Sequence, residues 1–475
     1  MISRFSEWVH AIAPRHIALA GLCGLSVVYL ACFRYDLYGV EEGAARALLL
    51  NWSLGTHMLN PVAIMGFPDM RALLLAPLNF HWIGDLTAAR TLAMFLTLAT
   101  GLMLYSWAEK QLGDETALFA SGLWLIAPLT ISQAGSIGAG NFLVLAGILC
   151  YWSSGYYRAS KHATPGNYFV LLLLIALAAS MHPAGLGMAA ALLWHETLIQ
   201  RPARRKRVAL YIGLGLMLFL ILASRAGWPT LSFFVNPLPA LTTVLTGGSV
   251  ADPSLGAGLL ALGLLLIALL SGIRRSRDDL FSAMLLGGVM AGLVSANEAW
   301  AELALTYILF EGLRGLIQLN NRFGGNGLLR RRGMAIFLVM LLSTGFMIAD
   351  KQYFLSNRTN QLHGVDNVIA RLGEITAAMD EQTMVATQWP GRTMLATRRG
   401  ALPLPPLRKD NPDAFLHQMR GVSFLVYDPN SSGMKGMNRQ VAELSNRIRT
   451  EAMLPGGIIL RLPDQRVENQ GAGKR

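Results

Sequence analysis

The chain has 475 residues, of which 53% are hydrophobic and only 14% charged, and its formal net charge is +12. A water-soluble globular protein carries about 25% charged residues, so this composition excludes a soluble, a disordered or a collagen-like chain over most of the length. The three cysteines lie in apolar stretches, which argues against a disulfide framework. Lys and Arg fall in short clusters between apolar runs, the pattern of a polytopic α-helical membrane protein, and no nucleic-acid partner is needed to explain it.

Eleven apolar runs are predicted to be transmembrane helices, because about 20 apolar residues cross a bilayer and shorter helices are tolerated inside a bundle. The first run lacks a small-residue cleavage site and is expected to be a retained anchor. The fifth and sixth runs are short and meet at His182-Pro183, so this pair alternatively forms a re-entrant hairpin. The runs are centred on 16–33, 90–107, 117–133, 139–153, 167–181, 183–196, 208–224, 255–273, 280–296, 298–313 and 334–349.

The positive residues predict the orientation of these spans, since cytoplasmic loops of membrane proteins are enriched in Lys and Arg. With a cytoplasmic N-terminus, eighteen Lys and Arg residues before residue 350 fall on the inside. Only Arg34, Arg46, Arg71 and Arg225 fall on the outside, with Arg90 at a boundary. An odd number of spans then carries residues 350–475 to the extracytoplasmic face.

Two segments are predicted to lie outside the membrane. The first outside loop, 34–89, is longer than a typical connection, and long ordered loops often carry function. Within this loop, residues 41–54 are predicted to form a helix with Glu42 and Arg46 one turn apart, whose apolar face suits the membrane interface.

The second such segment, 350–475, is predicted to be a compact extracytoplasmic α/β domain that follows a transmembrane domain of residues 1–349. Helices are expected at 365–379, 412–419 and 437–453, and strands at 383–387, 393–397, 422–427 and 458–462.

The chain has no P-loop, HExxH, G-x-S-x-G or CxxC motif, and Gly288 and Gly292 form a GxxxG helix-packing pattern. Acidic residues stand out on the predicted outside face. Such a carboxylate can act as a general base for a hydroxyl or amine nucleophile; alternatively it is a solvated interfacial charge or a helix N-terminal charge favoured by the dipole. These residues are Asp36, Glu41 and Glu42 after the first span, Asp69 later in the loop, and Glu298 and Glu302 at the start of the tenth span.

After span one the chain carries Arg34-Tyr35-Asp36 and Glu41-Glu42-Gly43-Ala44-Ala45-Arg46, and then a long loop and span two. This order resembles the GT-C superfamily of membrane glycosyltransferases. The similarity points in particular to the branch of the lipid A aminoarabinose transferase and the protein O-mannosyltransferases, whose first outside loop carries an acidic pair followed by a helix. Further similar segments are Phe67–Pro77, Trp82-Ile83-Gly84, Ala89-Arg90, Gly113–Leu129, Trp389-Pro390 and Arg398-Arg399-Gly400.

Three positions depart from the family pattern. Asn141 stands where the family has an aspartate at the start of span four, His182 replaces a lysine that many members have, and Glu41 rather than Asp leads the acidic pair. Each departure keeps related chemistry, since Asn still hydrogen-bonds, His can carry charge and Glu keeps a carboxylate.

The resemblance implies transfer of a sugar from an undecaprenyl- or other polyprenyl-phosphate donor to a glycan, lipid or protein acceptor. The reaction is expected on the extracytoplasmic face of a bacterial inner membrane, with Glu41 or Glu42 as the base. The phosphate is already a good leaving group, so no cofactor or metal is expected. The residues implied for donor binding are Asp69, Arg71, Asn141, His182 and Arg225, with His57 and His81 behind them, and Glu298 and Glu302 form a second acidic site for the acceptor.

Two alternatives remain beside this enzyme. The first is a catalytically inactive GT-C relative that binds lipid-linked glycans as a scaffold in cell-envelope assembly, which the Asn141 departure favours. The second is a transporter, but paired repeats are not recognisable and the centres of spans two to nine carry no charged residue.

Overall fold

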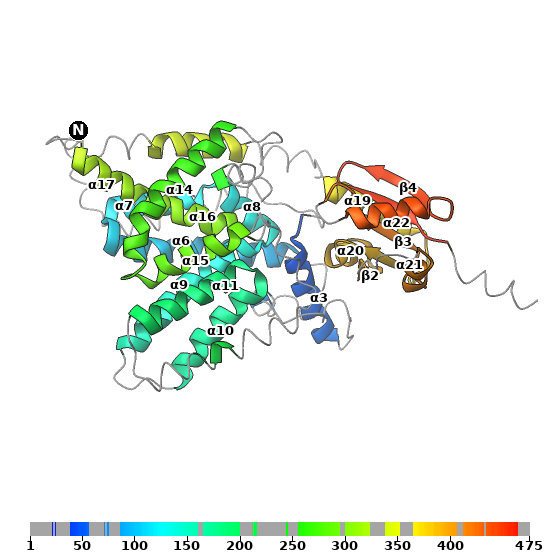
Figure 1. The fold of residues 1–475 in the computed structure, drawn as a ribbon, viewed down its shortest axis with the longest axis horizontal. Coiled ribbons are helices and arrows are strands. Elements are labelled where there is room, and N and C mark those ends of the chain that lie inside the picture. The colour runs from blue at the N-terminus through cyan, green and yellow to red at the C-terminus, as the bar shows by residue number, and fades with distance from the viewer. Residues whose placement is uncertain are drawn as a thin grey trace, which may run out of the picture. The chain divides into compact units, whose positions relative to one another are not determined.

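A computed structural model describes most of the two predicted domains. The described residues divide into two compact units, each considered by itself below (Figure 1). The helical unit lies within 1–34, 66–74 and 87–359, and the sheet unit within 35–65, 75–86 and 360–475. The described ranges are 39–56, 86–159, 165–199, 255–294, 300–323, 338–351, 364–405, 412–431 and 434–463, with the short pieces 21, 24, 71, 74–75, 211, 213–215 and 244–245.

Helices occupy nearly every predicted apolar run within the described part of the helical unit. Two of them contain a single π-helical turn, η1 (His195–Ile199) and η2 (Ile308–Gly312). The runs centred on 16–33 and 208–224 lie outside the described residues except for the short pieces 21, 24, 211 and 213–215. The α-helices are α6 (Leu86–Leu112), α7 (Asp114–Leu125), α8 (Pro128–Ser136), α9 (Ala139–Ala159), α10 (Pro165–Met181), α11 (Ala184–Trp194), α14 (Leu255–Arg275), α15 (Leu280–Val294), α16 (Trp300–Tyr307), α17 (Leu313–Phe323) and residues 338–351.

The predicted span centred on 117–133 consists of two helices rather than one. The chain bends there by 50° between Thr116–Leu125 and Pro128–Ser136. Pro128 lacks a backbone N–H and its ring excludes a helical carbonyl four residues earlier, so it starts a new helix after the extended residue Ala127.

Few of the described helices are both long enough and apolar enough to cross a bilayer. In the described part of the chain, α6 is long and apolar enough, and α7 with α8 makes a second if the bent pair counts as one span. Four shorter apolar helices are Ala139–Gly155, Phe169–Met181, Gly258–Ile273 and Leu280–Gly292. The total of eleven spans therefore stays a prediction.

Glycines allow α11 and α15 to pack closely against each other (Figure 1). A Cβ atom on Gly187 would overlap the carbonyl oxygen of Gly287, and the reverse also holds. On α15, Gly288 leaves room for Leu303 of α16 and Gly292 leaves room for Trp300 of α16. The GxxxG pattern is therefore confirmed as a packing surface.

The sheet unit is built on a five-stranded mixed sheet in the order β2-β1-β3-β5-β4. β1 pairs in parallel with β2 and β3, whereas β5 pairs antiparallel with β3 and β4. The strands are β1 (Met384–Thr387), β2 (Gly400–Pro403), β3 (Phe424–Tyr427), β4 (Arg449–Leu454) and β5 (Gly457–Arg461), and the helices are α19 (Gly364–Ala377), α20 (Pro390–Thr397), α21 (Pro412–Gln418) and α22 (Lys435–Glu443).

Alternating side chains give this sheet two apolar faces. On one face Phe424 and Val426 pack with Val368 and Leu372 of α19. On the other face Leu425 and its neighbours pack with residues of α21 and α22, including Phe415, Leu416 and Met437. The predicted α/β character of the C-terminal region is confirmed.

Two predicted elements of this region are wrong. Residues 393–397 form the end of helix α20, because Pro390 starts a helix well and a distant carboxylate caps it. The helix expected at 437–453 ends at Glu443, and β4 follows, because residues from Arg449 pair with β5 across the turn at Pro455-Gly456. The short strand β2 was not predicted.

The helix predicted in the first outside loop is α3 (Glu42–Thr56), and its predicted ion pair joins Arg46 Nε to Glu42 Oε1 at 3.1 Å. It belongs to the sheet unit, where it packs on α20. The buried residues Ala44, Ala45 and Leu48 form its apolar face.

Candidate functional site

The turn between α8 and α9 is an unusual piece of backbone. Ile137 ends α8 in the left-handed region, with φ 56°, a conformation that a β-branched residue rarely adopts. The Gly138 N–H donates to Gln133 O at 2.7 Å, and the Gln133 side chain accepts from Gly140 N at 3.1 Å. These bonds hold the strained turn closed and direct two of its carbonyl groups toward arginines.

Arg71 and Arg90 both donate to this turn. Arg71 Nη1 lies 3.2 Å from Ile137 O, and Arg90 Nε lies 2.8 Å from Gly135 O. Both side chains are 1% exposed, which is rare for arginine. The chain therefore places two buried guanidinium groups at one backbone turn.

His182 is a further buried polar side chain of the helical unit, and the charge of Arg71 acts on it. It occupies the break between α10 and α11, where its Nδ1 accepts the Ala184 N–H at 3.0 Å. Burial, and then the charge of Arg71, lower the pKa of His182 from 6.5 to about 4. The imidazole is therefore neutral at physiological pH, and the proton belongs on Nε2, since Nδ1 is the acceptor.

The Nε2 atom of His182 is buried and has no hydrogen-bond partner among the described residues. A buried donor without a partner is costly, so this N–H is suited to a ligand oxygen. Guanidinium and imidazole N–H groups in a buried setting are the chemistry that binds phosphate or carboxylate oxygens. These groups make the region a candidate anion site.

Asn141 and Glu302 belong to a buried hydrogen-bond network behind this turn. Asn141 Nδ2 donates to Thr97 Oγ1 and to Thr130 O, both at 3.0 Å, and Thr130 Oγ1 donates to Glu302 Oε1 at 2.7 Å. Glu302 is fully buried, and Trp124 Nε1 donates to Thr306 Oγ1 beside it. This network ties α6, α8, α9 and α16 together beneath the anion site.

The sheet unit contains the predicted catalytic pair. Glu41 precedes α3 and its carbonyl accepts the Ala45 N–H at 2.9 Å, the first hydrogen bond of the helix. The Glu42 carboxylate accepts the backbone N–H groups of Gly391 and Arg392, at 2.6 and 3.1 Å, as well as Arg46 Nε. Glu42 therefore caps the N-terminus of α20, where an anion is favoured.

The structure places the predicted site residues as follows. Arg71 contacts the α8–α9 turn and its charge acts on His182, and Asn141 and Glu302 belong to one hydrogen-bond network, while their roles in donor or acceptor binding stay predictions. Glu41 lies in the other unit, so its placement next to the donor stays a prediction. Asp69, Arg225, Glu298, His57 and His81 lie outside the described residues.

Sequence reasoning missed Arg90 and Gln133 as site residues. Arg90 stands at the edge of the apolar run 90–107, and a charge there marks a functional or structural site because it is costly in the membrane. Gln133 is a polar residue near the end of another apolar run, and no local pattern indicates that it closes a turn. In the described residues, no group of His, Cys, Asp and Glu could hold a metal ion.

Comparisons with solved structures find similar folds. The structure of ArnT from Cupriavidus metallidurans in the apo state covers 96% of this chain and 98% of its own, with TM-score 0.52 and 12% identity. The same enzyme bound to undecaprenyl phosphate covers 94% and 98%, with TM-score 0.49 and 11% identity.

A more distant match is the oligosaccharyltransferase AglB from Archaeoglobus fulgidus, in complex with an inhibitory peptide and a dolichol-phosphate. It covers 87% of this chain and 69% of its own, with TM-score 0.49 and 11% identity. No protein-family model matches the chain, and a comparison with curated protein sequences finds no match. Across nearly its full length, the chain is similar in structure to the GT-C membrane glycosyltransferases.

Proposed function

We propose that the chain is a membrane glycosyltransferase that moves a sugar from a polyprenyl-phosphate donor to an acceptor on the extracytoplasmic face. The observation that carries the proposal is the pair of buried guanidinium groups, Arg71 and Arg90, at one backbone turn of a chain with this fold, together with the unpartnered buried His182 Nε2–H on which the Arg71 charge acts. A phosphate next to hydrocarbon needs such donors, because a buried unpaired charge costs several kcal/mol.

In this mechanism the donor phosphate accepts hydrogen bonds from Arg71 and His182. The acceptor oxygen attacks the anomeric carbon, the bond from that carbon to the phosphate oxygen breaks, and the acceptor proton passes to a carboxylate. The leaving polyprenyl phosphate keeps the electron pair, and the donors at the turn stabilise its charge. Neutral His182 contributes a hydrogen bond here rather than a positive charge.

We assign the base to Glu41 rather than Glu42. Both oxygens of Glu42 already accept backbone N–H groups of α20, and Oε1 also accepts from Arg46. These three donors hold the Glu42 carboxylate against α20, so it has a structural role as a helix cap. Glu42 then positions α3, and with it Glu41, through α20.

Membrane placement is part of the same proposal. Large apolar side chains more than half exposed stand on the outer surfaces of the helical unit, which suits lipid contact rather than water. These are Phe95, Phe119, Phe169, Leu270, Met340 and Met347, among others. With the charge count of the loops, we propose a multi-pass protein of a bacterial inner membrane with a cytoplasmic N-terminus and a periplasmic sheet unit.

The test uses the full-length protein in liposomes with a panel of undecaprenyl-phosphate-linked monosaccharides and a cell-envelope acceptor extract. Glu41→Gln should abolish transfer and leave binding of undecaprenyl phosphate intact, whereas Arg71→Ala should weaken that binding at least about tenfold. Glu42→Gln is the matched control and should retain part of the transfer.

Full transfer by the Glu41→Gln variant would contradict the assigned base. Binding of undecaprenyl phosphate by a wild-type protein that transfers no sugar from any donor would favour the non-catalytic scaffold instead.

A further inference from the structure

The Gln133 side chain joins the two helices on either side of the α8–α9 turn. Its Oε1 accepts the Gly140 N–H at 3.1 Å, and its backbone carbonyl accepts the Gly138 N–H at 2.7 Å. Gly140 is the second residue of α9, so its N–H is one of the donors that a helix leaves without an internal partner. Gln133 therefore closes the end of α8 and caps the start of α9 together.

The residue that normally caps such a helix has no side chain here. A capping oxygen usually comes from the residue just before the helix, and before α9 that residue is Gly138. A Cβ atom on Gly138 would overlap the Oε1 and Cδ atoms of Gln133. The Gln133 carboxamide thus fills the space of a side chain at position 138. The two residues form an interlocked pair, in which the glutamine fits because position 138 is glycine.

This closure matters because the turn is strained. Ile137 has φ 56°, a conformation that a β-branched residue keeps only when the surrounding structure holds it there. The same turn presents Ile137 O to Arg71 at 3.2 Å and Gly135 O to Arg90 at 2.8 Å. Loss of the Gln133 side chain would let the turn relax and withdraw both carbonyl groups from the arginines.

The two carbonyl contacts orient the arginines in advance of a ligand. A guanidinium is planar and rigid, so one fixed N–H sets the direction of the other N–H groups of Arg71 and of Arg90. A carbonyl group is neutral, so these contacts do not cancel the positive charge. A side chain that is already ordered loses less conformational entropy on binding, which increases the affinity for a ligand.

We propose that Gln133 is a positioning residue of the candidate anion site. Its carboxamide holds the α8–α9 turn, the turn holds Arg71 and Arg90, and the two guanidinium groups are thereby set for a phosphate oxygen. The proposal rests on the proposed function, in which this region binds the phosphate of a polyprenyl donor. It adds that the Gln133–Gly138 pair controls the affinity for that phosphate from outside the contact with the ligand.

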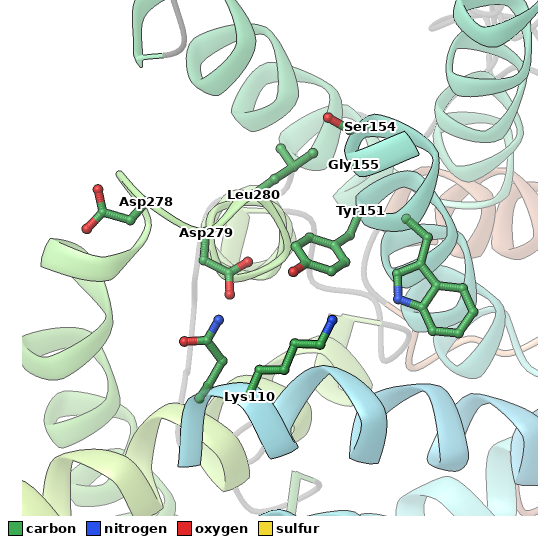
Figure 2. Close-up of a pocket in the computed structure, with 9 residues that line it drawn as sticks. Lys110, Tyr151, Ser154, Gly155, Asp278, Asp279 and Leu280 are labelled. Carbon is green, nitrogen blue, oxygen red and sulfur yellow. The ribbon is translucent and has the colours of Figure 1, made fainter. Parts of the chain in front are cut away.

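A matched control residue comes from a polar cavity of about 330 Å³ that opens where α6 and α9 end and α15 begins (Figure 2). Its Asp279 carboxylate already accepts four donors, as many as a carboxylate usually takes. These are Trp107 Nε1, Arg275 Nη2 and the backbone N–H groups of Phe281 and Ser282. Gln111, an exposed residue in the last turn of α6, also lines this cavity.

The test is equilibrium binding of undecaprenyl phosphate and of undecaprenol to the purified full-length protein in nanodiscs. The two lipids share the hydrocarbon chain and differ in the phosphate, so the ratio of their dissociation constants measures the phosphate preference. Gln133→Ala should lower this preference at least about threefold, which is the usual cost of a lost helix cap expressed as a ratio of dissociation constants. Gln111→Ala, the same substitution at an exposed position, should keep it.

The interlocked pair predicts a specific non-additivity. Gly138→Ala should lower the phosphate preference as Gln133→Ala does, because the added Cβ displaces the carboxamide. Alanine suits the backbone there, since φ of Gly138 is not positive. In the Gln133→Ala background the same change should have no further effect, because no carboxamide is left to displace. Gly122→Ala on α7, where a Cβ meets nothing within 4 Å, is the control and should keep the preference.

A general loss of stability is distinguished by Gly272→Ala on α14, whose Cβ would overlap the Tyr307 hydroxyl. This variant should melt at a lower temperature and keep the phosphate preference. An equal loss of preference in Gly272→Ala would overturn the positioning role, as would effects of Gln133→Ala and Gly138→Ala that multiply in the double variant.

Failure of the positioning role and failure of the proposed function give different results. A wild-type protein that binds undecaprenyl phosphate and undecaprenol equally would contradict the candidate anion site, and with it the proposed function. A wild-type phosphate preference that survives Gln133→Ala unchanged would overturn only the positioning role of Gln133.

Discussion

The Glu42 carboxylate is expected to stabilise the sheet unit as a helix cap. Replacing a capping residue with alanine costs about 0.5–2 kcal/mol, so Glu42→Ala should lower the free energy of unfolding by that amount. Hydrogen exchange at the Gly391 and Arg392 amides, which donate to Glu42, should speed up in the variant. Glu443→Ala, which removes an exposed ion pair with Arg439, is the control and should change stability by less than about 0.5 kcal/mol. Unchanged exchange at the two amides would contradict the capping role.

His182 is expected to make stability depend on pH. Its pKa is lowered from 6.5 to about 4 in the folded chain, so between these values the unfolded chain binds a proton that the folded chain does not. The free energy of unfolding should therefore decrease as the pH falls from 6.5 to 4, with His182 contributing roughly 3 kcal/mol. Thermal unfolding at several pH values checks this.

The His182→Gln variant isolates that contribution, because glutamine can accept from Ala184 N–H and donate like the imidazole but does not titrate. The difference in stability between wild type and variant should shrink or invert toward pH 4. A difference that is constant over this range would show that His182 is not the titrating group.

At the scale of elements, the crossing of α11 over α15 depends on the absence of side chains. Gly187→Ala places a Cβ against the Gly287 carbonyl oxygen, and since backbone cannot move aside locally the helices must separate. Overpacking of this kind costs about 1–3 kcal/mol. The control is Gly263→Ala on α14, where a Cβ meets nothing within 4 Å and alanine should stabilise the helix by up to about 1 kcal/mol. Equal melting temperatures for the two variants would contradict the close crossing.

The end of α8 has a consequence for the site at the same scale. Ile137 ends α8 in the left-handed region, in the turn that receives Arg71 and Arg90. A helix continuing through this turn would have used the carbonyls of Gly135 and Ile137 internally. The end of α8 thus makes these backbone acceptors available to the two arginines.

At the scale of the whole molecule, the orientation can be measured directly. A reporter fused after Arg475 should be active only on the extracytoplasmic side, and one inserted within 201–207, a cluster of basic residues, only in the cytoplasm. An odd number of spans between the two positions would follow. Finding both reporters in the same compartment would contradict the eleven-span topology.

Local patterns in the sequence determined the positions of most helices and of the apolar strands β1, β3 and β5. These features follow from the periodicity of apolar residues. Only the tertiary structure decided that Glu42 caps α20, that Arg90 reaches the α8–α9 turn, and that residues 449–454 form β4. Each of these depends on a partner distant in the chain, more than 300 residues away for Glu42, or on strand pairing across a turn. Such contacts override local propensity because burying a satisfied polar group or pairing a strand outweighs the small preferences that a sequence window carries.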